Sequence, residues 1–130
     1  MVAGQAISER RSRPRMPLRH CRARIRRCPW RLWIPSGQEA ITPVLNLSLG
    51  GMAIVGRHHY RLGEHVLATL YPKGQARAAR ARLTVRGRVA WCVAPGSGTR
   101  ELVGIQFVGR SAALHRRITD WAARHRHLLA

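Results

Sequence analysis

The sequence predicts an all-β fold, a six-stranded antiparallel β-barrel closed by a C-terminal α-helix. Several short apolar segments, separated by turns rich in Gly, Pro and Ser, follow one another at close spacing between residues 20 and 108. After Ser111 the period of the apolar residues changes from two to between three and four. A chain of 130 residues that is 45% hydrophobic is long enough to bury such a core in one domain.

The N-terminal region is predicted to be a basic arm that leads into the first strand. Residues 1–8 show no periodic pattern and are expected to be flexible, so the folded domain is placed at residues 9–128. Prolines interrupt residues 9–31, which disfavours a continuous helix and favours an extended arm. Arginines alternate with small or apolar residues over 20–27, as in a strand with one solvent-facing side. The apolar segment 30–34 either extends this strand or forms a flap that offers a partner surface.

Five further strands are expected after this first one. They are placed at residues 40–47, 51–55, 64–71, 83–93 and 101–108. The first two are separated by Ser and Gly, which tight turns favour, and the last two flank a Pro-Gly-Ser-Gly turn and form a hairpin. In the strand 83–93 every second residue is apolar or Gly, and Trp91 belongs to the same alternating set as Val89.

The C-terminal segment is predicted to be an amphipathic helix that closes one end of the barrel. Ser111 is a suitable N-cap. The residues on the expected inner face recur at steps of three and four, and they are Leu114, Ile118, Trp121, Ala122, His125 and Leu128.

The charge of the chain is strongly unbalanced. Lys and Arg number 24, with Lys73 the only lysine, against five Asp and Glu, and the formal net charge is +19. This balance favours anionic partners, whether nucleic acid, acidic lipid head groups, an acidic protein surface or a phosphorylated ligand. Codon usage in a GC-rich genome explains the general arginine excess equally well, but it does not explain where particular arginines lie.

Several classes of protein are disfavoured by what the sequence lacks. Three cysteines without a CxxC pair, following an N-terminus without an apolar signal segment, predict a cytoplasmic protein without disulfides. His20, Cys21 and Cys28 lack the second close pair of ligands that a structural zinc site needs, so no metal is expected. No apolar run approaches the ~18 residues of a transmembrane helix.

No catalytic arrangement is found, and the protein is predicted not to be an enzyme. Ser48 is not a nucleophile elbow, because Asn46 occupies the position that needs Gly. Gly96-Ser97-Gly98 lacks the third Gly of a dinucleotide fingerprint. The pair His58-His59 is expected to be solvated, and the five carboxylates are scattered along the chain.

Two short motifs stand out from the remainder of the sequence. The arm contains Glu9-Arg10-Arg11-Ser12-Arg13-Pro14-Arg15, which places arginines on a segment stiffened by proline. The turn after the second strand contains Asn46-Leu47-Ser48-Leu49-Gly50-Gly51. Residues two apart on a strand share a face, so Asn46 and Ser48 are expected to present their polar groups together.

These motifs resemble those of the PilZ domain family, which binds the bacterial second messenger cyclic di-GMP (c-di-GMP). The family pattern is RxxxR followed, after a first strand, by [D/N]xSxxG. Arg11 and Arg15 match the first motif, with Arg10 as the additional arginine, and the segment LNLSLGGMAI matches the second. The later segments RGRVAW and ELVGIQFVGRSAALHRRITDW resemble the closing hairpin and helix of the family, so the similarity extends from residue 9 to about residue 128.

The resemblance implies a role for each motif residue. The arginines Arg10, Arg11 and Arg15 would hold phosphate and guanine, for which a planar guanidinium is well suited. Asn46 and Ser48 would bond a base edge, and Gly51 would let the ligand approach the backbone. Trp91 resembles an aromatic residue that some members place beside a guanine, although a core position is an equally good interpretation.

The resulting hypothesis is a non-enzymatic c-di-GMP receptor without a cofactor, in which ligand binding orders the N-terminal arm. A downstream protein partner is expected but not identified. One alternative is a basic nucleic-acid-binding barrel that uses arginines and exposed tryptophans. Another is a degenerate PilZ fold used for protein contacts alone.

Overall fold

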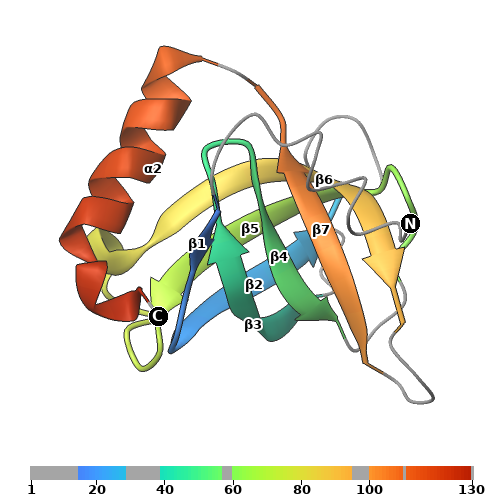
Figure 1. Ribbon diagram of the computed structural model, residues 1–130, viewed down its shortest axis with the longest axis horizontal. Helices are drawn as coiled ribbons and strands as arrows, with labels where there is room; N and C mark the ends of the chain where they lie inside the picture. The colour runs from blue at the N-terminus through green and yellow to red at the C-terminus, as the bar shows by residue number, and fades with distance from the viewer. Residues whose placement is uncertain (1–14, 29–38, 57–59, 95–99, 110, 130) are drawn as a thin grey trace.

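The computed structural model describes residues 15–28, 39–56, 60–94, 100–109 and 111–129. The strands are β1 (Met16–Pro17), β2 (Cys21–Arg27), β3 (Glu39–Leu47), β4 (Gly51–Gly56), β5 (His65–Pro72), β6 (Leu83–Val93) and β7 (Glu101–Phe107). The helical elements are η1 (Ala79–Ala81), α2 (Ala112–Arg124) and η2 (Arg126–Leu128). Every predicted strand is matched by one of β2 to β7, and the predicted helix by α2 (Figure 1).

The sheet closes into the predicted six-stranded antiparallel barrel. The strand order is β3-β2-β5-β6-β7-β4, and the pairing of β4 with β3 closes the barrel. Closure gives each of these strands at least two neighbours, which satisfies the backbone groups that an open sheet leaves at its edges. The predicted N-terminal arm up to residue 14, the apolar segment 30–34, the turn 95–99 and the pair His58-His59 lie outside the described residues.

β1 was not predicted as a strand, because the sequence here indicates only an extended arm. Met16 pairs with Leu47 and Pro17 with Asn46, so the end of the arm lies along the end of β3. The next residues contact the C-terminal segment, since Leu18 forms a bridge with Leu129 and the Arg19 N–H donates to the Leu128 carbonyl at 2.6 Å. The arm is therefore fixed at its base between β3 and the end of the chain.

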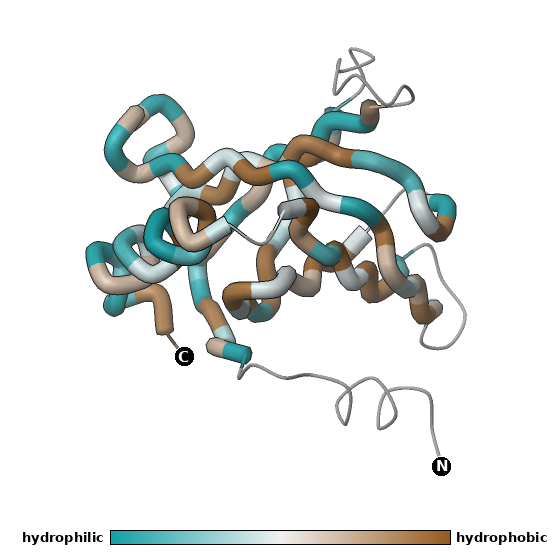
Figure 2. The backbone as a smooth tube through the Cα atoms, turned by 90° about the horizontal axis from the view of Figure 1, so that it is seen from above, coloured by the Kyte–Doolittle hydropathy of each residue, from teal (hydrophilic) through white to brown (hydrophobic). Residues whose placement is uncertain are grey.

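The core follows from the alternation that the sequence shows. On β2 the residues Cys21, Ala23 and Ile25 are at most 2% exposed, while the arginines between them face outward. Hydrophilic and hydrophobic residues alternate along much of the backbone (Figure 2). Burial raises the pKa of the Cys21 thiol to about 12, as expected for a thiol desolvated in an apolar interior. All three cysteines are free thiols.

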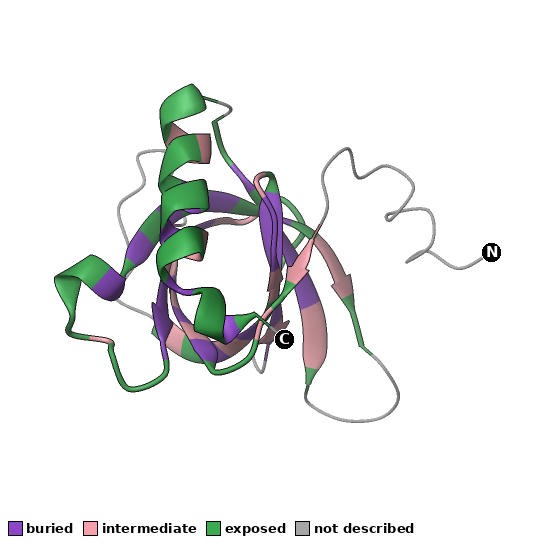
Figure 3. Cartoon of the chain, turned by 60° about the vertical axis from the view of Figure 1, so that its left-hand side comes forward, coloured by how far each residue is buried: buried purple, intermediate pink, exposed green. Residues whose placement is uncertain are grey.

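α2 packs one face against the barrel and leaves the other in solvent, as predicted (Figure 3). The Ser111 hydroxyl accepts a hydrogen bond from the Leu114 N–H and caps the helix. Trp121 is 1% exposed, and its indole N–H donates to the Ala81 carbonyl at 2.8 Å. This bond joins the helix to the segment that enters β6.

Two β-bulges interrupt the regular pairing and change which residues face outward. The register between β3 and β4 shifts between Val44 and Asn46. The register between β6 and β7 shifts between Val89 and Trp91. A bulge moves the following side chains to the opposite face. The prediction that Trp91 continues the alternating set of Val89 is therefore wrong.

No described helix is long and apolar enough to cross a membrane. The described residues contain no group of three His, Cys, Asp or Glu side chains placed to hold a metal ion.

Candidate functional site

The two bulges bring Asn46 and Trp91 into one row on the outer face of the barrel. Asn46 on β3 is paired with Ala53 on β4, Ala53 with Gly104 on β7, and Gly104 with Trp91 on β6. Residues directly opposite one another on antiparallel strands share a face of the sheet. The row therefore presents an amide at one end, an indole at the other, and two small residues between them.

Arg15 contacts the amide end of this row. Its Nη1 donates to the Oδ1 of Asn46 at 2.7 Å. β1 makes this contact possible, because Pro17 pairs with Asn46 and so brings the preceding arm residues beside β3. The Asn46 amide nitrogen carries two further donors, and the guanidinium of Arg15 stays charged at any physiological pH. Two of the predicted ligand-binding residues thus lie together.

Ser48 has a different place from the one expected. It lies just past the end of β3 and is 5% exposed. Its hydroxyl accepts from the N–H groups of Gly50 and Gly51, each at 3.2 Å, and donates to the Gly51 carbonyl at 3.3 Å. The expectation that Asn46 and Ser48 present their polar groups on one face is wrong, because the Ser48 hydroxyl is buried and closes the turn.

Gly51 is required by the packing of the barrel itself. It pairs with Gln106 on β7, and a Cβ at this position would collide with the carbonyl oxygen of Ile105. The glycine allows β4 to lie close to β7 directly after the Ser48 turn. The absence of a side chain at Gly51 thus lets β4 approach β7, whereas the family resemblance implied that it lets the ligand approach the backbone.

Trp91 lies across Gly104, at the other end of the row. A Cβ on Gly104 would overlap the indole ring, so only glycine leaves room for the tryptophan in this position. Trp91 is partly exposed and is not among the buried core residues. The core interpretation of Trp91 is wrong, and the indole is on the same outer face as Asn46.

Sequence reasoning missed Ala53 and Gly104, which form the floor between the two ends of the row. No sequence pattern links Ala53 and Gly104 to Asn46 and Trp91, because only the pairing of β3, β4, β7 and β6 brings these four residues together. Arg10 and Arg11 lie outside the described residues.

The family model for the PilZ domain matches residues 9–124. The chain belongs to the PilZ domain family, which confirms the resemblance seen in its motifs. The predicted limits of the domain, residues 9 and 128, stay predictions. No curated protein sequence matches the chain.

Solved structures share the fold at low sequence identity. The motility inhibitor MotI (DgrA) of Bacillus subtilis is 16% identical, with a TM-score of 0.61 over 91% of this chain and 51% of its own. The PilZ domain of YcgR from Escherichia coli, solved with c-di-GMP, is 13% identical, with a TM-score of 0.61 over 91% of this chain and 95% of its own. The MrkH–c-di-GMP complex of K. pneumonia is 18% identical, with a TM-score of 0.59 over 90% and 54%. The chain thus spans about half the length of MotI and MrkH.

Proposed function

We propose that this protein is a receptor for c-di-GMP and that the ligand binds on the row from Asn46 to Trp91. The observation that carries the proposal is the contact between Arg15 and Asn46 at one end of a row whose other end is an indole. The proposal is also supported by the family and by similar folds, YcgR and MrkH, that were solved with c-di-GMP.

Each end of the row suits a different part of such a ligand. Arg15 offers a charged, planar donor for a phosphate or for the acceptor edge of guanine. The Asn46 amide adds donors to a base edge. Trp91 offers a flat apolar ring on which a purine can stack, and stacking of this kind contributes about 1–3 kcal/mol per base. The small residues Ala53 and Gly104 are themselves buried, and the Trp91 indole lies across Gly104, so they set the position of the ring on which the ligand would stack.

In this proposal the arm completes the site when the ligand arrives. Arg10 and Arg11 lie only a few residues before Arg15, which is held at β3. They would add guanidinium groups over the ligand, so ligand binding would order the arm. The ordered arm would change the surface of the protein, and a non-enzymatic receptor can signal to a partner in this way. Ser48 and Gly51 would act indirectly, by holding the turn that fixes Asn46. The three free thiols suit the cytoplasmic location that we propose.

A single-stranded nucleic acid bound through exposed tryptophans is less well supported. Of the two tryptophans that the structure describes, Trp121 is 1% exposed and is bonded to Ala81. Only Trp91 remains as a stacking platform among the described residues, whereas single-strand binding uses several in succession.

The proposal is tested by titrating the full chain with c-di-GMP and with cyclic di-AMP in a calorimeter. Adenine lacks the O6 acceptor of guanine, so cyclic di-AMP should bind more weakly by about 1–3 kcal/mol per misread base. Equal affinities would contradict base recognition by Arg15 and Asn46. Absence of heat with both ligands would reject the receptor function.

A further inference from the structure

The outer face of β2, β5 and β6 carries a set of arginines that the candidate c-di-GMP site does not use. These strands are neighbours in the barrel, and the register places Arg26, Leu67 and Arg86 side by side in one row. We call this surface the basic wall. It consists of Arg22, Arg24 and Arg26 on β2, and of Arg82, Arg86 and Arg88 on β6 or directly before it.

The arginines of the basic wall all point away from the core. On β6 the residues Leu83, Val85 and Val89 are buried, while the intervening positions up to residue 90 are exposed. After the bulge Trp91 also lies on the outer face, farther along β6 and opposite Gly104 on β7. The basic wall and the Asn46–Trp91 row therefore share only β6, on opposite sides of its bulge.

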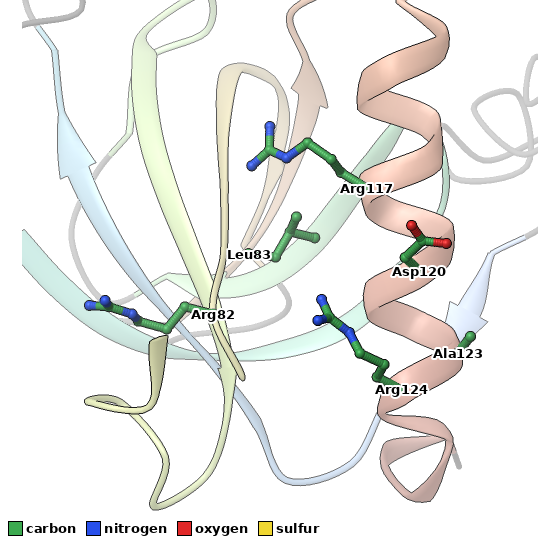
Figure 4. A pocket seen from close by; sticks show the side chains of 6 residues that line it. All are labelled: Arg82, Leu83, Arg117, Asp120, Ala123 and Arg124. Carbon is green, nitrogen blue, oxygen red and sulfur yellow. The ribbon is translucent and has the colours of Figure 1, made fainter. Parts of the chain in front are cut away.

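α2 adds a further arginine to the β6 side of the basic wall. The Nη2 of Arg117 donates to the Thr84 carbonyl at 2.7 Å, so this guanidinium lies beside β6 between Arg82 and Arg86. Arg117 and Arg124 extend from α2 over a hollow of about 460 Å³ beside Leu83 (Figure 4). The positive surface is thus continuous from β6 onto the helix.

The carboxylates of Glu39 and Asp120, which lie beside this surface among the described residues, compensate its charge only in part. Glu39, at the edge of the basic wall, lies 3.5 Å from Arg26 and 4.0 Å from Arg24. One carboxylate is therefore shared by two guanidinium groups. Asp120 lines the hollow together with Arg82, Arg117 and Arg124. The surface keeps a net positive charge.

The spacing of the arginines suits the two backbones of a nucleic acid duplex. β2 and β6 are two strands apart, which separates their arginines by about 10 Å across the convex barrel. The major groove between the two phosphate backbones of DNA is about 12 Å wide. Along β2 successive outward arginines are about 6.8 Å apart, and the phosphates of one strand advance by ~3.4 Å each along the helix axis. Each row of arginines can therefore face one of the two backbones.

Two other anionic partners fit the basic wall less well. Lipid surfaces favour apolar side chains that insert between the head groups. None of the large exposed apolar side chains among the described residues lies on β2, on β5 or on β6 before its bulge. Single strands need exposed aromatic rings for stacking. The large aromatic side chain on β2, β5 and the part of β6 before its bulge is Tyr71, which is 5% exposed.

We propose that the basic wall binds duplex DNA through its phosphates, without reading the base sequence, as a second activity of this protein. The guanidinium rows supply bidentate donors to phosphate oxygens. Base recognition is not expected, because the centre of the basic wall presents Leu67 and the paired hydroxyls of Thr69 and Thr84. This proposal does not depend on the c-di-GMP site.

The test measures binding of the full chain to a labelled duplex of about 20 base pairs by fluorescence anisotropy at several salt concentrations. With four to six phosphates neutralised, affinity should fall by about 10²–10³-fold between ~50 and ~200 mM salt. The pairs Arg24→Gln/Arg26→Gln and Arg86→Gln/Arg88→Gln should each reduce the slope of log K against log salt by about 2. A second duplex of unrelated sequence should bind with the same affinity within about threefold.

The matched control is the pair Arg61→Gln/Arg100→Gln, which removes the same charge from exposed positions outside the basic wall and should leave the slope unchanged. Because Lys keeps the charge, Arg86→Lys/Arg88→Lys should also keep the slope, which separates loss of contact from loss of fold. No duplex binding at ~50 mM salt would overturn the proposal. So would an equal loss in the control pair, tighter binding of a single strand, or binding of anionic phospholipid vesicles in place of the duplex.

Discussion

On β3, β4 and β7 the Asn46–Trp91 row presents an amide and small residues, whereas across β2, β5 and β6 the outer face of the barrel carries rows of arginines. On the first face Arg15 is held at a defined point, by a 2.7 Å bond to Asn46. On the second face the arginines repeat with the period of the strands. The difference corresponds to the two modes of anion recognition that we propose: by the position of a few groups, or by charge density alone.

The two faces also differ in how their residues come to face outward. The basic wall follows directly from strict alternation on β2 and β6. The Asn46–Trp91 row exists because a bulge precedes each of its end residues. Bulges are common beside binding sites, because they redirect a side chain without ending the sheet.

The largest predicted effect separates the core from both faces. Trp121→Ala should destabilise the protein by about 3–5 kcal/mol, because it removes a buried indole. Trp121→Phe should cost about 1–3 kcal/mol, because it leaves the Ala81 carbonyl without its donor. Trp91→Ala, at a partly exposed position, should change the free energy of unfolding much less. Urea unfolding measures all three, and equal losses for the two Ala variants would refute the distinction between them.

The next prediction concerns the packing of Trp91 against Gly104. Gly104→Ala places a methyl group where the indole lies, so it should weaken c-di-GMP binding by about 1–3 kcal/mol, as Trp91→Ala should. In the double variant the two losses should not add, because both remove the same ring position. Gly50→Ala is the control, since a Cβ there meets no atom within 4 Å. Unchanged affinity in Gly104→Ala, measured by calorimetry, would argue against a ligand on this row.

Much of the fold could be predicted from the sequence, because alternation and a change of period are local signals. The strands β2 to β7, the cap at Ser111 and the inner face of α2 were predicted in this way. The bulges were not, since they depend on how one strand pairs with another. For this reason Trp91 was placed in the wrong set, and Gly104 and Ala53 were missed. The motif residues Arg15 and Asn46 were predicted from family resemblance, and their contact required β1, which is too short to show a pattern.

The pH dependence of stability distinguishes the inner and outer sides of β2. Burial raises the pKa of the Cys21 thiol from about 9 to about 12. The unfolded chain therefore loses this proton at lower pH than the folded one. The stabilisation is complete below about pH 9 and is lost as pH rises toward 12.

Cys21→Ala should accordingly show a shallower fall of stability between pH 9 and pH 11 than the wild type. The outward Arg24→Ala should leave that slope unchanged, because arginine stays charged over this range. Chemical denaturation at several pH values measures both. Equal slopes for the wild type and Cys21→Ala would show that the thiol is not protected in the folded state.

The most direct test of the account is calorimetric titration of c-di-GMP at ~200 mM salt into the wild type, Arg15→Ala and Arg24→Ala. Both variants remove one arginine from the outer side of the barrel, but only Arg15 contacts Asn46. The wild type and Arg24→Ala should bind alike, and Arg15→Ala should lose about 1.5–3 kcal/mol, which is the usual contribution of a hydrogen bond to a charged group. Equal weakening in the two variants, or no binding by the wild type, would contradict the claim that position rather than charge selects this ligand.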